Sequence, residues 1–289
     1  MDIQQFTQLI INGIAVGSII ALAAVGLTLT YGILRLSNFA HGDFLTLGAY
    51  LTFFLNSLGV NIWLSMVLSA VGTVGVMLLT EKLLWSRMRA IRASSTTLII
   101  ISIGLALFLR NGIIFTWGGQ NKNYNLPITP ALELGGLRVP QNQLLVLVLA
   151  ILAIAFLHYL LQHTKIGKAM RAVADDLDLA RVSGINVDQV ILWTWIIAGT
   201  FTALGGSMYG LITAVRPNMG WFLILPLFAS VILGGIGNPY GAILGAFIIG
   251  IVQETSTPWL GSQYKQGIAL LIMILVLFIR PKGLFKGTT

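Results

Sequence analysis

Long apolar runs separated by short polar gaps are the feature that most constrains this chain. A membrane-spanning helix needs about 20 apolar residues, and we mark about nine runs near that length. They are Leu9–Leu34, Phe44–Leu58, Ile62–Leu79, Thr96–Trp117, Gln143–Leu161, Val190–Ala214, Trp221–Leu233, Gly241–Val252 and Gln266–Ile279. The sequence therefore predicts an all-α polytopic membrane protein with about 8–10 transmembrane helices, some of them broken. We expect a single transmembrane domain over residues 1–289.

The composition excludes several other classes of protein. Only 9% of the 289 residues are charged and 56% are hydrophobic, whereas soluble domains carry about a quarter charged residues. The absence of cysteine excludes thiol catalysis, cysteine-ligated zinc and iron–sulfur clusters, and we expect no metal site. The net charge is +8, but the basic residues lie in the gaps between apolar runs. We therefore expect membrane lipid around the chain and no nucleic acid partner.

The basic residues predict how the chain is oriented, because Lys and Arg are enriched in cytoplasmic loops. They cluster in the gaps 82–92 and 165–181 and again in the tail, as Arg280, Lys282 and Lys286. The segments 118–142 and 255–265 carry few of them. An outer N-terminus and a cytoplasmic C-terminus satisfy all of these assignments, with about nine passes between them.

Three runs are shorter than a full membrane span. Segments 44–58, 221–233 and 241–252 hold about 12 to 15 residues each, so they either belong to broken helices or re-enter the membrane. The breaks beside them are Asn38–Asp43 and Gly234–Gly241. One break in each half of the chain is typical of an inverted-repeat transporter with a central pathway.

These two breaks supply the candidate residues for the translocation path. The candidates are Asn38, His41, Asp43, Gly234, Gly235, Gly237 and Asn238, because ionisable groups at membrane depth usually face a cavity or a partner. The alternative, which we favour for the first break, is a capping or scaffold role in which Asp43 is the N-cap of a helix that starts at Phe44. The glycine-rich break also fits a simple turn.

Two further charged residues lie close to apolar runs. Arg110 follows the apolar stretch that ends at Leu109, and Glu254 lies near the outer edge of another run. We expect the Arg110 side chain to snorkel to the membrane surface or to bind a local partner. An ion pair with a carboxylate is the alternative for Arg110, and Glu254 has the same two interpretations.

The longest cytoplasmic connection, Thr164 to Gln189, carries a helical pattern. Its apolar positions recur every three or four residues, which predicts one helix with a narrow apolar stripe; they are Ile166, Met170, Val173, Leu177, Ala180 and Gly184. Such a stripe suits docking in a groove of another protein. The alternative is a helix on the lipid surface, but anionic headgroups would repel Asp175, Asp176 and Asp178. We therefore favour a protein partner.

Several motifs in this chain order resemble the ABC importer permeases for branched-chain and other hydrophobic amino acids. The segment Asp178–Gly184 is similar to their EAA-x-x-x-G element, although Asp178 and Leu179 replace Glu and Ala and the trailing I-x-L-P is missing. The other similar segments are Asn38–Asp43, Gly167–Asp175, Gly184–Val187, Leu233–Asn238 and Arg280–Phe285.

This resemblance implies a type II-like importer permease rather than an enzyme. It implies two ATP-binding-cassette ATPase subunits, a second related permease and an extracytoplasmic binding protein as partners, in a bacterial inner membrane. It also implies that residues 164–189 form a coupling loop that docks on the ATPase, with Arg171, Asp175, Asp178, Ala180 and Gly184 as its candidate contacts. Because the chain has no G-x-x-x-x-G-K-[ST] motif, we expect ATP to be bound by the partners and no cofactor in this chain.

The leading hypothesis is alternating access in an importer of neutral or branched-chain amino acids, driven by the partner ATPase. A urea or amide permease of the same family is one alternative. Another is an ion-coupled carrier, which would need carboxylates inside its spans, and Asp43 and Glu254 are almost the only ones. A membrane enzyme with His41 and Asp43 as an acid–base pair is a third, without an accompanying nucleophile.

Overall fold

The structure, a computed structural model, describes residues 2–126, 130–134, 136–281 and 283–285. Lys282 and Lys286 of the predicted basic tail lie outside the described residues. The elements are α1 (Ile3–Leu34), α2 (His41–Ser57), α3 (Ile62–Thr80), the π-helical turn η1 (Glu81–Trp85), α4 (Ser86–Ala90), α5 (Ser95–Trp117), β1 (Leu132–Leu134), β2 (Leu137–Val139), α6 (Gln141–His163), α7 (Lys165–Asp175), α8 (Leu177–Val182), α9 (Val187–Ile212), α10 (Met219–Gly234), α11 (Pro239–Thr255), α12 (Thr257–Leu260), the 3-10 turn η2 (Ser262–Tyr264) and α13 (Lys265–Ile279).

Each predicted apolar run coincides with one helix to within a few residues. Among the described residues, six helices are long and apolar enough to cross a membrane, namely Ile3–Leu34, Ile62–Ala90, Ser95–Trp117, Gln141–His163, Val187–Ile212 and Ser262–Ile279. The three short runs are α2, α10 and α11, with 17, 16 and 17 residues. At 1.5 Å per residue they are about 25 Å long, less than the roughly 30 Å of the hydrocarbon core. The prediction of an all-α polytopic membrane protein is confirmed.

Side-chain caps mark where several helices begin. Asn61 accepts a hydrogen bond from the Trp63 amide at the start of α3, and Ser94 accepts one from the Thr97 amide at the start of α5. Asn186 does the same for the Gln189 amide at the start of α9. These caps pair amides that have no partner within the helix, so short polar residues between apolar runs determine the local boundaries.

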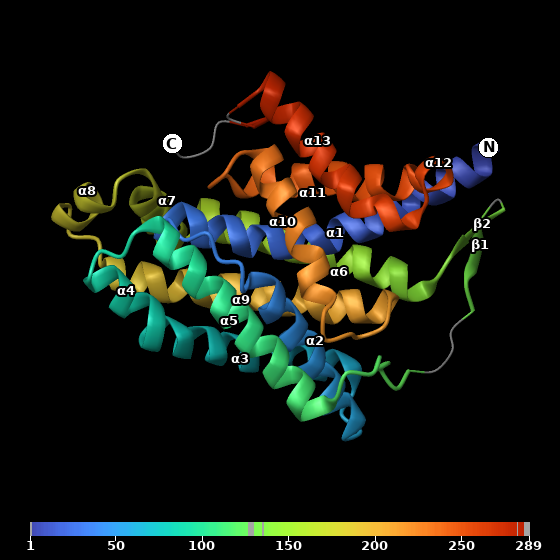
Figure 1. Ribbon diagram of the computed structural model, residues 1–289, viewed down its shortest axis with the longest axis horizontal. Coiled ribbons are helices and arrows are strands. Elements are labelled where there is room, and N and C mark those ends of the chain that lie inside the picture. The colour runs from blue at the N-terminus through green and yellow to red at the C-terminus, as the bar shows by residue number, and fades with distance from the viewer. Residues whose placement is uncertain (1, 127–129, 135, 282, 286–289) are drawn as a thin grey trace.

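Helix α1 forms the centre of the bundle. It runs through the middle of the molecule in Figure 1, and residues 19–25 are at most 1% exposed. Its closest neighbour is α11, because glycines on both helices remove the side chains that would hold them apart. A Cβ atom added to Gly250 would lie 2.5 Å from the Gly17 Cα atom and 2.6 Å from the Gly13 carbonyl oxygen. Contacts of this kind are how small residues drive helix association in lipid.

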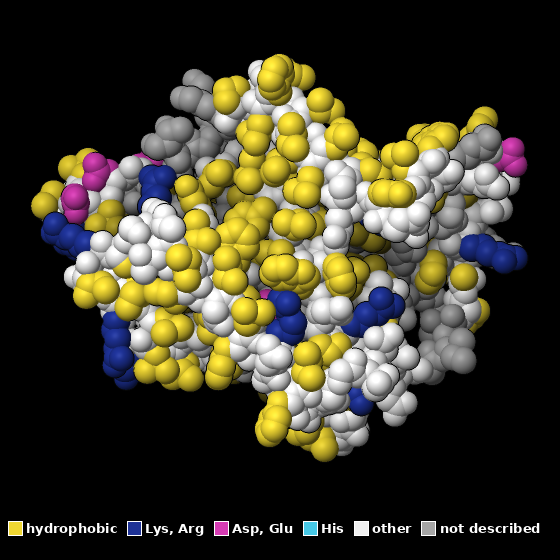
Figure 2. Space-filling model, in the orientation of Figure 1, with side chains coloured by type: hydrophobic (Ala, Val, Ile, Leu, Met, Phe, Trp, Pro, Cys, Tyr) yellow, Lys and Arg dark blue, Asp and Glu magenta, His cyan; other side chains and the backbone are white. Residues whose placement is uncertain are grey.

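The two ends of the bundle differ in composition. Both predicted basic loops, which contain α4 and the α7–α8 pair, lie at one end, whereas the N-terminus and the β1–β2 hairpin lie at the other (Figure 1). Figure 2 shows a largely apolar face between these ends, with most of its charged side chains at the margins and a small group in the middle. The apolar band between two polar ends is the distribution that a bilayer requires.

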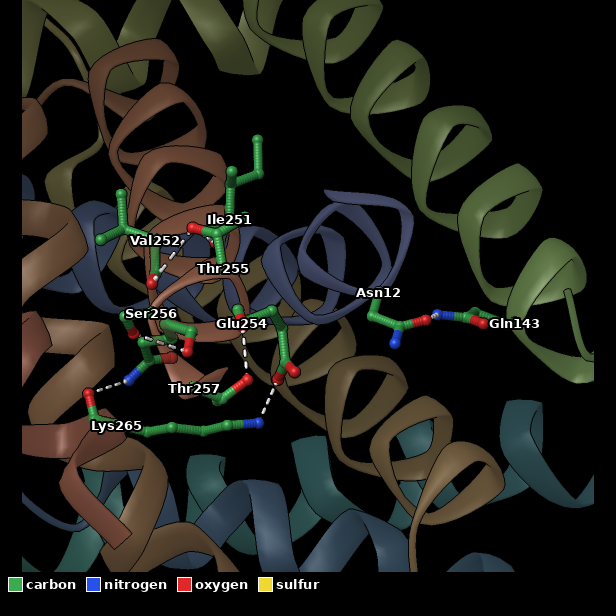
Figure 3. A network of polar contacts seen from close by, with 10 residues as sticks. Asn12, Gln143, Ile251, Val252, Glu254, Thr255, Ser256, Thr257 and Lys265 are labelled. Atoms are coloured by element: carbon green, nitrogen blue, oxygen red, sulfur yellow. Dashed lines mark hydrogen bonds and ion pairs between the residues drawn. The ribbon is translucent and has the colours of Figure 1, made fainter. Parts of the chain in front are cut away.

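Polar side chains tie the helices together at the N-terminal end of the bundle (Figure 3). Lys265 at the start of α13 forms an ion pair with Glu254 at the end of α11, with 2.5 Å between Nζ and Oε1. The Gln143 side chain of α6 donates to Asn12 of α1 at 3.1 Å. Glu254 therefore forms an ion pair with a side chain of another helix, one of the two interpretations that its sequence position allowed.

Replacing Gly250 with leucine tests the packing of α1 on α11. The new side chain would meet the backbone of Gly13 and Gly17, which cannot rotate away, so we expect a destabilisation on the order of 3 kcal/mol and low recovery of folded protein. The matched control is Gly104→Leu in α5, where an added Cβ atom meets nothing within 4 Å. Thermal unfolding in detergent would measure both, and equal stability of the two variants would contradict this packing.

Candidate functional site

The first break in the helices lies between α1 and α2 and is buried. Helix α1 ends at Leu34, and Arg35 turns the chain with a φ of 52°. Helix α2 begins at His41, so Asp43 lies in its first turn and makes no capping hydrogen bond. The interpretation of Asp43 as the N-cap of a helix that starts at Phe44 is therefore wrong, because the helix begins earlier than the apolar run does.

Asp43 instead binds Arg110 of α5. The two side chains form a bidentate ion pair, with Arg110 Nε 3.0 Å from Oδ1 and Nη2 3.1 Å from Oδ2 of Asp43. The Trp221 ring of α10 covers the guanidinium, with 4.7 Å between Cζ and the ring centroid. The expectation that Arg110 snorkels or binds locally is wrong, since its partner lies in another helix.

This ion pair lies well inside the length of α5, a helix long and apolar enough to cross a membrane. Arg110 is about two helical turns, or roughly 10 Å, inward from Trp117 at the end of α5. An aromatic contact of α5 with α2, between Trp117 and Tyr50 at 5.5 Å, is likewise about two turns beyond Asp43. The two helices therefore run parallel, and α2 begins beside the interior of α5 rather than beside its end.

His41 and Asn38 bind other parts of the same break. His41 Nε2 is 2.9 Å from the Ala23 carbonyl oxygen of α1 and 2.9 Å from Thr202 Oγ1 of α9. Because a carbonyl oxygen only accepts hydrogen bonds, we assign the ring proton to Nε2. The Asn38 side chain accepts from the Ala40 amide at 3.1 Å. Both residues hold the break in place, and their presence on a translocation path stays a prediction.

The glycine-rich break is a tight turn between α10 and α11. Gly235 and Gly237 have φ angles of 107° and 86°, which favour glycine. Asn238 caps α11 by accepting from the amides of Tyr240 and Gly241, each at 3.1 Å. A Cβ atom on Gly234 would lie 2.0 Å from the Gly241 carbonyl oxygen. These contacts confirm the turn, and the role of these residues in transport stays a prediction.

A second helix begins beside the start of α2. Helix α10 starts at Met219, and a Cβ atom on Gly42 would lie 2.3 Å from the Gly220 carbonyl oxygen. The Gly220 amide donates to Thr46 Oγ1 of α2 at 3.0 Å. The sequence analysis missed this contact, although the Arg216–Pro217–Asn218 stretch before α10 is a recognisable helix boundary.

The coupling segment, residues 164–189, contains two helices instead of one. Asp176 ends α7 and caps α8 by accepting from the Leu179 amide at 2.9 Å. The predicted single helix is therefore wrong, because the Asp176 side chain competes for a backbone amide. Met170, Val173 and Ala180 of the predicted stripe are buried against this chain's own core. The buried part of the stripe thus anchors the segment to this chain, whereas Gly184, the last position of the stripe, is exposed.

The opposite face of the coupling segment is the exposed one. Leu179 and Val182 of α8 are 62% and 81% exposed, and Asp175, Asp178 and Gly184 are exposed near them. Gly184 ends α8 with a φ of 85°. Arg171 is exposed but also donates to the Leu161 carbonyl oxygen of α6. Leu179 and Val182 are three residues apart, so the sequence alone indicates that they share one face of a helix. This second apolar face is not part of the predicted stripe.

The N-terminal end of the bundle carries a buried phenol. Tyr124, in the loop after α5, donates to the Ala49 carbonyl oxygen at 3.3 Å. Burial raises the pKa of Tyr124 above its ordinary value, so it remains a neutral donor that ties the loop to α2. Among the residues that the structure describes, no three His, Asp or Glu side chains gather closely enough to hold a metal ion.

Comparisons with known proteins give the family. A family model described as branched-chain amino acid transport system / permease component matches residues 9–277. The chain is 32% identical over 306 residues to the high-affinity branched-chain amino acid transport system permease protein LivH of Escherichia coli, which covers 96% of this chain and 95% of that protein. It is 29% identical over 299 residues to the corresponding permease protein BraD of Pseudomonas aeruginosa, with 98% and 96% covered.

The similarity extends to a more distant organism. The chain is 31% identical over 298 residues to the probable branched-chain amino acid transport permease protein LivH of Methanocaldococcus jannaschii, with 96% of this chain and 92% of that protein covered. No solved structure matches this chain. The matches span nearly the whole length on both sides, and they agree with a helical, multi-pass membrane architecture. The chain therefore belongs to the family of permease components of branched-chain amino acid transport systems.

Proposed function

We propose that this chain is the membrane-spanning subunit of an ATP-driven importer, and that it moves branched-chain and other neutral amino acids into the cytoplasm by alternating access. The names of the full-length relatives support this substrate class. The chain contains no phosphate-binding G-x-x-x-x-G-K-[ST] motif. ATP would therefore be hydrolysed by partner subunits, and this chain would convert their motion into transport.

The proposed assembly contains two ATPase subunits, a second related permease and an extracytoplasmic binding protein, in a bacterial inner membrane. We place the N-terminus outside and the C-terminus in the cytoplasm. The arrangement in Figure 1 supports this orientation, since α4 and the α7–α8 pair carry clustered basic residues and lie at the same end. Lys and Arg clusters of this kind mark the cytoplasmic side.

The coupling segment is the observation that carries the proposal. Leu179 and Val182 are exposed apolar side chains on a short helix at the end that we assign to the cytoplasm. Met170 and Val173 of α7 are packed in the core, and Thr164 caps α7 directly at the end of α6. A force applied to α8 would therefore reach α6 through packed side chains instead of bending a free loop, as a transmitting element requires.

The alternatives fit the contacts less well. An ion-coupled carrier needs carboxylates inside its spans that can bind and release protons or cations, and Asp43 and Glu254 are almost the only ones in this chain. A membrane enzyme would use His41 and Asp43 together, but His41 binds Ala23 and Thr202 while Asp43 binds Arg110. Urea transport has no separate observation in its favour.

Replacing Leu179 and Val182 with glutamate tests the docking surface. Removing two apolar contacts from a protein interface typically weakens it by about 10-fold or more, so we expect binding-protein-stimulated ATP hydrolysis and leucine uptake to fall together. The chain itself should still insert and fold, because both side chains are exposed. The control is Lys168→Gln, which changes an exposed residue on α7. Normal stimulation in the double glutamate variant would exclude this surface as the ATPase contact.

The energy source separates the importer from an ion-coupled carrier. Uptake of labelled leucine into proteoliposomes that contain all subunits should require internal ATP and should persist when an ionophore collapses the ion gradients. Uptake of labelled urea by the same vesicles serves as the substrate control and should stay at background. Transport by the purified chain alone on an ion gradient would overturn the proposal.

A further inference from the structure

A charged cluster lies where α2, α5 and α10 meet. It contains Arg110 of α5 and Asp43 of α2, with the Trp221 ring of α10 over the guanidinium. A charge at this depth is costly in contact with lipid, so this junction is expected to border a polar path or a protein instead of lipid.

The ion pair is accessible from one side only. The Asp43 side chain is 1% exposed, whereas the Arg110 side chain is 15% exposed and Trp221 is 45% exposed. Asp43 uses two N–H groups of Arg110, and a guanidinium carries five. The guanidinium can thus present further donors toward its exposed side, and the Trp221 ring covers one of its faces.

A separate apolar cavity lies toward the predicted cytoplasmic end. Its volume is about 230 Å³, and its walls come from α1, the α1–α2 break, α5 and α10, including Leu27, Tyr31, Phe39, Ile99 and Phe228. Trp221 and Phe228 lie about two turns apart on α10 and share a face, which separates the cavity from the ion pair by roughly 10 Å. The charged groups thus lie nearer one end of α10 and the apolar cavity nearer the other.

We infer that the Arg110–Asp43 pair is the contact site for the charged groups of the transported amino acid. The substrate carboxylate binds the Arg110 guanidinium and its ammonium binds the Asp43 carboxylate, and the aliphatic side chain points toward the apolar cavity. This inference rests on the proposed function, because it takes the cargo to be a neutral amino acid zwitterion. It adds to the importer hypothesis the two residues that recognise the cargo.

Charge balance is the physical argument for this assignment. Without cargo, the two side chains neutralise each other, so the junction of α2, α5 and α10 holds no unpaired charge at low dielectric. A zwitterion brings one positive and one negative group, so exchanging the internal pair for two intermolecular pairs leaves the site neutral. A cargo with only one charge leaves either Arg110 or Asp43 unpaired, which is costly at this depth. The pair therefore selects for both charges at once.

The competing interpretation is a structural tether that fastens α5 to α2. A tether requires only that the two side chains match each other, so replacing both with neutral amides restores a balanced pair. A cargo site requires the charges themselves. The combination of Asp43→Asn with Arg110→Gln therefore separates the two roles, since it removes both charges and leaves no unpaired one.

The test compares both single variants and the double variant in the complete importer, with ATPase and binding protein present. We expect the double variant to lose leucine uptake by about 10-fold or more, a loss of at least about 1.4 kcal/mol, while binding-protein-stimulated ATP hydrolysis continues. The matched control is the pair Glu254→Gln and Lys265→Gln, another ion pair between two helices, which should keep uptake near the wild-type rate. Recovery of wild-type uptake in the Asp43→Asn, Arg110→Gln variant would overturn the inference.

A labelling experiment keeps the inference testable if the charge variants fail to assemble. The chain lacks cysteine, so Leu107→Cys places one thiol on α5 about one turn from Arg110, and Phe115→Cys supplies a control on another side of the same helix. Both positions are exposed. Saturating leucine should slow maleimide labelling at position 107 only, and 4-methylpentanoate and 3-methylbutylamine, which carry one charge each, should not. Equal labelling at position 107 with and without leucine would refute the site.

The outcomes also separate this inference from the proposed function. If the wild-type importer takes up no leucine, the proposed function fails before the site is tested. If the wild-type importer transports leucine and the neutral pair transports it equally well, only the assignment of Arg110 and Asp43 fails.

Discussion

The backbone of a membrane-spanning chain must find hydrogen-bond partners inside the protein, and this requirement governs the two helices that begin at depth. The amides of a first helical turn have no partner within the helix, and lipid offers none. Asn38 supplies one at the start of α2, where its side chain accepts from the Ala40 amide. Thr46 supplies one at the start of α10, where it accepts from the Gly220 amide. One backbone amide at each helix start thus has a side-chain acceptor, from two residues earlier in the chain for α2 and from another helix for α10.

The lipid environment also explains why the helices pack so closely. Lipid tails are as apolar as leucine side chains, so burial alone does not hold helices together in a bilayer. Gly13, Gly17 and Gly250 let α1 and α11 approach to backbone contact, and Gly42 and Gly220 do the same for the starts of α2 and α10. The centre of the bundle is therefore held at backbone contact.

Charged side chains inside the bundle are paired, because lipid cannot solvate an unpaired charge. At membrane depth Asp43 and Arg110 neutralise each other, and near the edge Glu254 and Lys265 do so. Unpaired charges, including Asp175 and Asp178, are exposed on the coupling segment at the end of the bundle. These charges are thus paired where they are buried and left unpaired where the surface is exposed.

The sequence by itself determined the features that depend on neighbouring residues. Run length predicted the helices and the three short ones, short polar residues placed caps such as Asn238, and the glycine-rich break became the predicted turn. It also carried the motifs that identify the family. Two of its predictions were wrong for the same reason, because both were judged from local spacing. Asp43 was expected to cap a helix but binds Arg110, and Asp176 was expected inside one helix but caps a second one at the Leu179 amide.

Only the tertiary structure decided which distant groups meet. Arg110 and Asp43 lie in different helices, so no local period links them, and the pairing arises because α2 begins at depth beside α5. The tertiary packing likewise turned the apolar stripe of the coupling segment inward and left Leu179 and Val182 outside. Hydrophobic periodicity shows that a helix has an apolar face, but what that face contacts depends on the position of every other helix.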